Sequence, residues 1–118
     1  MTTAPRIAIY ARYSSDLQRP SSIADQIALC RSLITRQFGE TAVVVAVYED
    51  AAQTGATMAR GGLADMLKDA EAGRFSIIVA EGLDRISRSL ADIASIHRMC
   101  QHYGVSLFTS HEGEVTDL

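Results

Sequence analysis

Short apolar runs alternate along this chain with stretches in which apolar residues recur every three or four positions. The runs are Ile7–Ala11, Thr41–Tyr48, Phe75–Ala80 and Val105–Thr109. Short continuous runs of this kind, several of them rich in β-branched residues, are typical of strands in a protein interior. The pattern therefore predicts four strands.

The segments between these strands have the periodicity and the end signals of helices. The first is predicted to begin at Ser22, a typical N-cap residue with Asp25 three positions later, and to end at Gly39. The other two are predicted from Leu63 to a stop at Gly73 and from Arg88 to a stop at Gly104. Strands and helices thus alternate along most of the chain.

This alternation predicts the fold class. A strand, a helix and a further strand form a parallel pair with the helix packed on one face of the sheet. We expect a three-layer α/β/α fold with a mainly parallel sheet of four to five strands. Polar loops are expected at 14–21 and at the glycine-containing segment 49–62, which we expect to be mobile, and the acidic tail 110–118 follows the last strand.

Length and composition favour one ordinary globular domain. The chain has 118 residues, of which 47 % are hydrophobic and 21 % charged. No apolar run approaches the roughly 20 residues that a membrane-spanning helix needs, and the first residues lack the apolar stretch of a signal peptide. We therefore expect a cytoplasmic protein with no membrane partner. Cys30 and Cys100 fall in helical apolar patterns and are predicted as buried thiols.

The charge balance limits what the domain can do alone. Its net charge is −3, whereas a free-standing DNA-binding domain is usually basic, because neutralising phosphates supplies most of the non-specific affinity. The cations are nevertheless ten arginines and a single lysine, Lys68. Arginine suits bidentate contacts to phosphate, although a GC-rich codon bias would produce the same excess.

Polar side chains gather where the predicted strands end. In an open parallel sheet, ligands bind outside the carboxyl ends of the strands. Arg12 and Ser14 follow the first strand; Glu49, Asp50 and, through the loop, Arg60 follow the second; Glu81, Asp84, Arg85 and Arg88 follow the third. Gln26 lies on the first turn of the first helix and is expected at the same edge, and Arg85 and Arg88 are expected on one face of a helix start.

One hydroxyl and several guanidinium groups at one edge fit phosphoryl transfer to a serine. Attack on a phosphodiester adds charge to the non-bridging oxygens, and arginines meet such oxygens with charge-assisted hydrogen bonds. Each well-placed donor contributes about 3 kcal/mol in the transition state.

Other chemistries lack their motifs. The chain has no G-x-S-x-G turn for a serine hydrolase and no glycine-rich nucleotide loop. The three histidines, His97, His102 and His111, lie late in the chain. His97 and His102 are five residues apart and do not share a helix face, so a metal site with Cys100 is not expected. We therefore predict neither a metal nor a cofactor.

The residues at the strand ends also carry a family resemblance. The segments that match are Tyr10–Ser14, Ser22–Gln26, Asp50 with Arg60–Leu63, Leu83–Ser89, and the closing Val105–Thr109 and Glu114–Asp117. In this order, over nearly the whole chain, they resemble the catalytic domain of serine recombinases, the resolvase and invertase family. The stretch between Ser14 and Gln26 is longer than in short resolvases, and with Ser15–Gln18 it looks more like large serine recombinases such as phage integrases.

The resemblance implies a mechanism and partners. Ser14 matches the nucleophile that joins a DNA 5′-phosphate, and Arg12, Arg85 and Arg88 match the arginines around the scissile phosphate. Arg60 matches the mobile-loop arginine, and Gln26 and Asp84 match polar residues that orient the site. The family implies no metal and no nucleotide. It also implies a bacterial or phage-encoded enzyme that acts on double-stranded DNA as a dimer and a synaptic tetramer.

The same resemblance suggests that residues 1–118 are the N-terminal catalytic domain, ending before a long dimerisation helix and a DNA-binding region. We expect this fragment to fold but to show little recombination. Two alternatives stay open from the residues alone: a non-catalytic phosphate-binding module or decayed family member acting through partners, and a serine-dependent phosphodiesterase of small esters.

Overall fold

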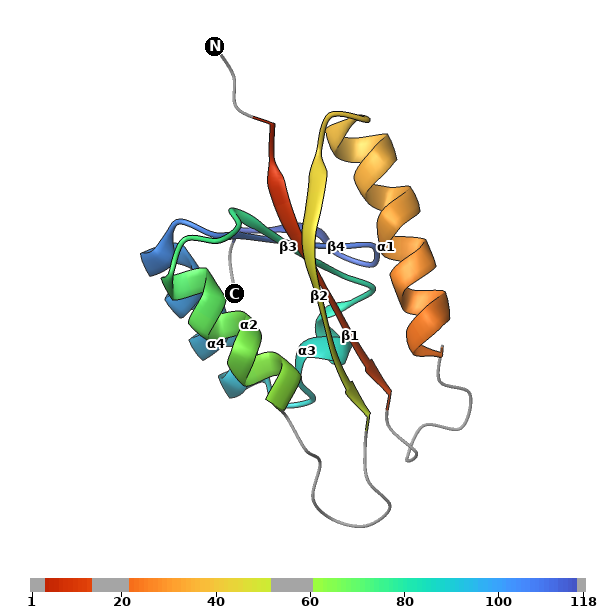
Figure 1. Ribbon diagram of the computed structural model, residues 1–118. Coiled ribbons are helices and arrows are strands. Elements are labelled where there is room, and N and C mark those ends of the chain that lie inside the picture. The colour runs from red at the N-terminus through yellow and green to blue at the C-terminus, as the bar shows by residue number, and fades with distance from the viewer. Residues whose placement is uncertain (1–3, 14–21, 52–60, 117–118) are drawn as a thin grey trace.

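The protein is a central sheet with helices on both faces, as the computed structural model shows in Figure 1. The structure describes residues 4–13, 22–51 and 61–116. Its elements are, in chain order, β1 (Arg6–Tyr13), α1 (Ile23–Phe38), β2 (Val43–Ala51), α2 (Gly61–Glu71), β3 (Ile77–Ala80), α3 (Leu83–Ile86), α4 (Leu90–Tyr103), β4 (Ser106–Thr109) and β5 (Gly113–Val115).

The sheet has the strand order β2-β1-β3-β4-β5. The first four strands are parallel and β5 runs antiparallel to β4. The prediction of a mainly parallel sheet with four to five strands is confirmed. The sequence pattern did not reveal β5, because it has three residues, of which Val115 alone is buried.

Two apolar layers hold the helices to the sheet. On one face, α1 packs Cys30, Leu33 and Ile34 against Ile7 and Ile9. On the other face, α2 and α4 pack against the alternate residues of the same strands. The helices contribute Met66, Ala70, Ile96 and Cys100, and the strands contribute Ala8, Tyr10, Ile78 and Leu107. Figure 1 shows α1 on one side of the strands and α2 with α4 on the other, so the α/β/α layering is confirmed.

The end signals of α1 act as the sequence predicts. The Ser22 hydroxyl accepts a hydrogen bond from the backbone N–H of Asp25 at 3.0 Å, which satisfies one of the free donors of the first turn. Gly39 ends the helix at a φ of +83°, where a residue with a Cβ would be strained.

The region after β3 differs from its prediction. The chain forms the short helix α3, leaves helical geometry at Ser87, and starts α4 at Leu90 with Ser89 as N-cap. The expectation that Arg85 and Arg88 share one helix face is therefore wrong. Ser87, in extended geometry, ends α3 between the two arginines, and Arg85 is buried while Arg88 is exposed.

Two strands run further than their apolar cores suggest. β1 continues through Arg12 to Tyr13, and β2 continues through Asp50 to Ala51, with Arg12 opposite Asp50 in the parallel register. Polar residues that the pattern places after the strands therefore sit inside them. In the described part of the chain, no helix is both long and apolar enough to cross a membrane.

Candidate active site at the carboxyl edge of the sheet

The backbone of Arg12 is held by the side chain of Gln26. The Arg12 N–H donates to Gln26 Oε1 at 3.1 Å, and Gln26 Nε2 donates to the Arg12 carbonyl at 2.9 Å. The described pairing of β3 with β1 ends at Ile9, so at Arg12 another partner takes the place of that strand. The fully buried Gln26 amide supplies that partner and fixes the end of β1 against α1.

The guanidinium of Arg12 joins β1 to α3. Its Nε donates to the carbonyl of Arg85 at 2.8 Å, and its Nη2 donates to the carbonyl of Asp84 at 2.5 Å. The last carbonyls of a helix have no partner within it, and a cation there also meets the negative end of the helix dipole. Arg12, 5 % exposed, therefore ties two segments more than 70 residues apart into one edge.

Arg85 lies at the same edge in an ion pair with Glu81, the residue directly after β3. Arg85 Nε donates to Glu81 Oε1 at 2.9 Å, and the two side chains are only 9 % and 11 % exposed. The Glu81–Arg85 spacing of four residues is the one sequence signal for this pair. Glu81 lies at the end of a predicted strand but is not among the predicted site residues.

Asp50 is a second polar residue at this edge that is not among the predicted site residues. Its carboxylate accepts from the Tyr10 hydroxyl at 2.7 Å and from the backbone N–H groups of Gly62 and Leu63 at 2.8 and 2.9 Å. It thereby holds the first turn of α2 against the ends of β1 and β2. Gly62 is required for this approach, since a Cβ there would lie 2.4 Å from the Glu49 carbonyl oxygen.

The turn between β4 and β5 covers the start of α3. Gly82 is the N-cap residue of α3 and has no side chain that could cap the helix. Glu112 instead accepts from the Leu83 N–H at 3.0 Å and from the Thr109 hydroxyl at 2.6 Å. His111, which its position in the sequence did not link to the site, lies over Gly82 at this edge; its Nδ1 is 2.5 Å from where a Gly82 Cβ would be.

The structure thus brings together Arg12, Gln26, Asp84 and Arg85, although Asp84 acts through its carbonyl and its side chain is exposed. Arg88 follows on the exposed link to α4. Ser14 and Arg60 lie outside the described residues. Among the described residues, no three histidine, cysteine, aspartate or glutamate side chains are grouped so that they could hold a metal ion.

Comparison with known proteins identifies the family. The model of the resolvase N-terminal domain matches residues 7–118. The chain belongs to this family. It is a recombinase catalytic domain of the resolvase type, as the motifs predict, and no match was found among the curated proteins.

Solved structures agree with this assignment of the resolvase domain. The N-terminal catalytic domain of TP901-1 integrase is similar with a TM-score of 0.75 and 25 % identity, over 92 % of this chain and 78 % of that one. A resolvase family site-specific recombinase from Streptococcus pneumoniae has a TM-score of 0.76 at 24 % identity, over 92 % and 74 %. A serine recombinase from Sulfolobus solfataricus has 0.65 at 18 %, over 98 % and 73 %. The last two likenesses concern the fold.

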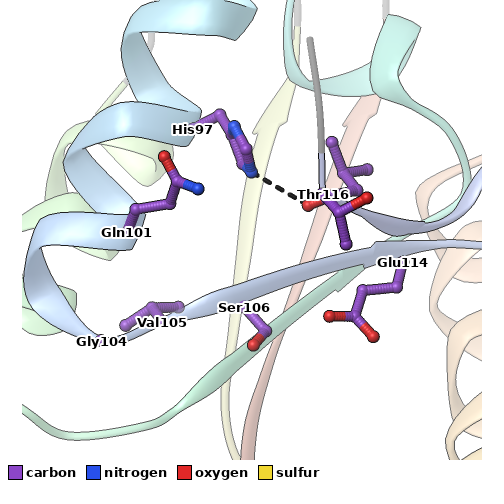
Figure 2. Close-up of a pocket in the computed structure, with 8 residues that line it drawn as sticks. His97, Gln101, Gly104, Val105, Ser106, Glu114 and Thr116 are labelled. Carbon is purple, nitrogen blue, oxygen red and sulfur yellow. Dashed lines mark hydrogen bonds between the residues drawn. The ribbon is translucent and has the colours of Figure 1, made fainter.

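A pocket of about 440 Å³ lies at the opposite end of β4 from the candidate site of this resolvase domain. Figure 2 shows His97 and Gln101 of α4 facing the start of β4 and the end of β5. His97 Nε2 lies 2.9 Å from the Val115 carbonyl oxygen, and because a carbonyl only accepts, this nitrogen donates. His97 is buried and joins α4 to β5.

Both cysteines of the resolvase domain are buried and free, which confirms their prediction. Burial, together with the negative charge of Glu81, raises the pKa of Cys30 to about 12, and burial raises the pKa of Cys100 to about 11. Thiols held neutral in this way are poor nucleophiles. Neither cysteine therefore competes with a serine for nucleophilic chemistry.

Proposed function

We propose that this domain breaks and rejoins DNA strands at specific sites, with Ser14 as nucleophile. The Ser14 oxygen attacks the scissile phosphorus, a serine–phosphate bond forms, and the bond from phosphorus to the 3′ oxygen breaks. The products are a 5′-phosphoserine and a free 3′-hydroxyl, and the serine proton balances the one that the leaving oxygen gains. Rejoining is the same exchange in reverse with a 3′-hydroxyl of the partner strand, so no external energy source is needed.

The observation that carries this proposal is the connection of Arg12 to α3. Ser14 follows β1 by one residue, and the Arg12 guanidinium binds the carbonyls of the helix that presents Arg85. The first strand end and the arginine segment after β3 are therefore one unit. A guanidinium placed on the non-bridging oxygens contributes about 3 kcal/mol to the transition state, so the arginines of this edge would supply a large share of the acceleration.

The remaining site residues have supporting roles in this proposal. Gln26 positions Arg12 through its backbone, and Asp84 contributes the carbonyl that Arg12 binds. Arg88, which is exposed, is proposed to reach the phosphate when DNA is present, and Arg60 to approach it from the loop after β2.

DNA and further subunits complete the proposed activity. The net charge of −3 gives this domain little general attraction to DNA, so we assign most of the DNA affinity to other parts of the functional assembly. We propose that the protein acts on double-stranded DNA as a dimer and, during exchange, as a synaptic tetramer. Its place would be the cytoplasm of a bacterial cell, where this DNA substrate is found.

Trapping of the covalent intermediate tests the proposal. Full-length protein is incubated with a suicide DNA substrate, nicked so that cleavage cannot be reversed, and adducts are separated on denaturing gels. The unsubstituted protein should form an adduct, the neighbouring control Ser15→Ala should form it as well, and Ser14→Ala should form none. Adducts that persist in Ser14→Ala would refute the assignment. No adduct in any variant would favour a phosphate-binding module without catalysis.

A further inference from the structure

The Glu81–Arg85 pair has a feature that its structural role does not require. The Arg85 side chain is 9 % exposed, and its Nε is bound to Glu81. A guanidinium has five N–H donors, four of them on the two terminal nitrogens. Within the described residues, no hydrogen bond or ion pair joins those terminal nitrogens of Arg85 to the protein.

Buried donors nearly always have partners in folded proteins. A buried guanidinium that is held at one nitrogen and has no described partner at the other two therefore points to a ligand-binding role. The ligand that satisfies two parallel N–H donors and a positive charge is an oxyanion such as a phosphate.

Glu81 is placed to control this ligand site. It directly follows β3, and its backbone carbonyl accepts from the His111 N–H at 3.1 Å, so its own backbone is fixed by the adjoining β4 segment. Its carboxylate binds Nε of Arg85. A phosphate can still make a bidentate contact with the two terminal nitrogens of the same guanidinium. Arg12 meanwhile binds the Arg85 carbonyl, which fixes the other end of the same residue.

We propose that Glu81 is a positioning residue that holds the Arg85 guanidinium in the orientation that receives the scissile phosphate. This inference rests on the proposed function and adds a residue to it. Glu81 also offsets part of the positive charge that Arg12 and Arg85 bury at this edge, so the site can form before DNA arrives. The plane of the Arg85 guanidinium is then already oriented when the scissile phosphate binds.

Substitutions at Glu81 separate this role from a purely structural one. Glu81→Gln keeps the size and an acceptor oxygen but removes the charge, and Glu81→Ala removes the acceptor. Glu40→Gln, at an exposed turn, is the matched control. All are measured in full-length protein as the single-turnover rate of covalent adduct formation on suicide DNA at saturating DNA, with DNA affinity measured separately.

We expect Glu81→Ala to slow cleavage by about 10- to 100-fold, because a misplaced contact costs about this much, with affinity changed less than about threefold. Glu81→Gln should show a smaller loss, and Glu40→Gln none. In an Arg85→Lys background, where no guanidinium plane remains to be oriented, Glu81→Gln should change the rate less than about twofold.

The outcomes distinguish the two proposals. If the unsubstituted protein and Glu40→Gln form no adduct, the proposed function fails. If they form it and the folded Glu81→Gln and Glu81→Ala proteins cleave at the same rate, the positioning role fails alone. It also fails if Glu81→Gln slows Arg85→Lys as much as it slows the unsubstituted protein. Should Glu81→Ala not fold, Glu81→Gln carries the comparison, because its amide can still accept from Arg85.

Discussion

Replacing Gln26 by leucine tests how the end of β1 is fixed. Gln26 is fully buried, and its side chain makes both of its described hydrogen bonds to the backbone of Arg12. Leucine has a similar volume but no polar atoms. The substitution therefore removes, in the interior, the partner that Gln26 supplies to one N–H and one carbonyl of Arg12.

The magnitude follows from these two groups. A buried polar group left without a partner costs about 1–3 kcal/mol, so two cost about 2–6 kcal/mol. Leucine recovers part of this, because burying its side chain contributes about 1.5–3 kcal/mol. We expect the free energy of unfolding to fall by about 2 kcal/mol. We expect the rate of DNA cleavage to fall as well, because the backbone that Gln26 holds belongs to Arg12, a residue of the proposed active site.

The assay is urea unfolding followed by circular dichroism, with Gln37→Leu as the control. Gln37 lies on the same helix but is exposed, so its substitution should change the free energy of unfolding by less than about 0.5 kcal/mol. If Gln26→Leu and Gln37→Leu were equally stable, the role assigned to the Gln26 amide would be wrong.

Two further predictions concern the packing of the domain. Gly62→Ala should lower the free energy of unfolding by about 1–3 kcal/mol in thermal or urea unfolding, because its Cβ would meet the Glu49 carbonyl. Gly61→Ala, with open space around its Cβ, should be neutral or slightly stabilising. Equal effects of the two substitutions would contradict this account of the β2–α2 contact. The raised pKa of Cys100, about 11, means that the folded state disfavours the thiolate, whereas an unfolded thiol ionises near about 8.5. The contribution of the neutral Cys100 thiol to the free energy of unfolding should therefore be fully present below about pH 8.5 and decrease as the pH rises toward 11. Cys100→Ala should make this decrease smaller in unfolding curves recorded between pH 7 and 10. An unchanged slope would show that Cys100 titrates alike in both states.

The sequence was most informative where a single local signal decides the structure. Apolar runs located β1 to β4, and Ser22 with Gly39 located both ends of α1. The order of motifs around Tyr10–Ser14 and Leu83–Ser89 led to the family. Each of these depends on residues that are close along the chain, which is why a pattern can reveal them.

The sequence was least informative where distant residues decide the structure. The α3 cap comes from Glu112, roughly 30 residues away, so Gly82 gives no local sign of a helix start. The partner of Asp50 at Tyr10 is 40 residues distant, and the partners of the Arg12 guanidinium are carbonyls, which every residue has. Glu81 was not predicted as a site residue, because an acid beside several arginines is typical of an ordinary ion pair. Its burial, which sets it apart, cannot be seen in the sequence.

The central claim is that the Ser14 oxygen forms the covalent bond to the DNA phosphate. Mass spectrometry of the trapped adduct tests this claim most directly. After nuclease digestion of the adduct, the account predicts a peptide that carries a nucleotide 5′-phosphate on Ser14. The same nucleotide found on Ser15, or on any other residue, would contradict the account.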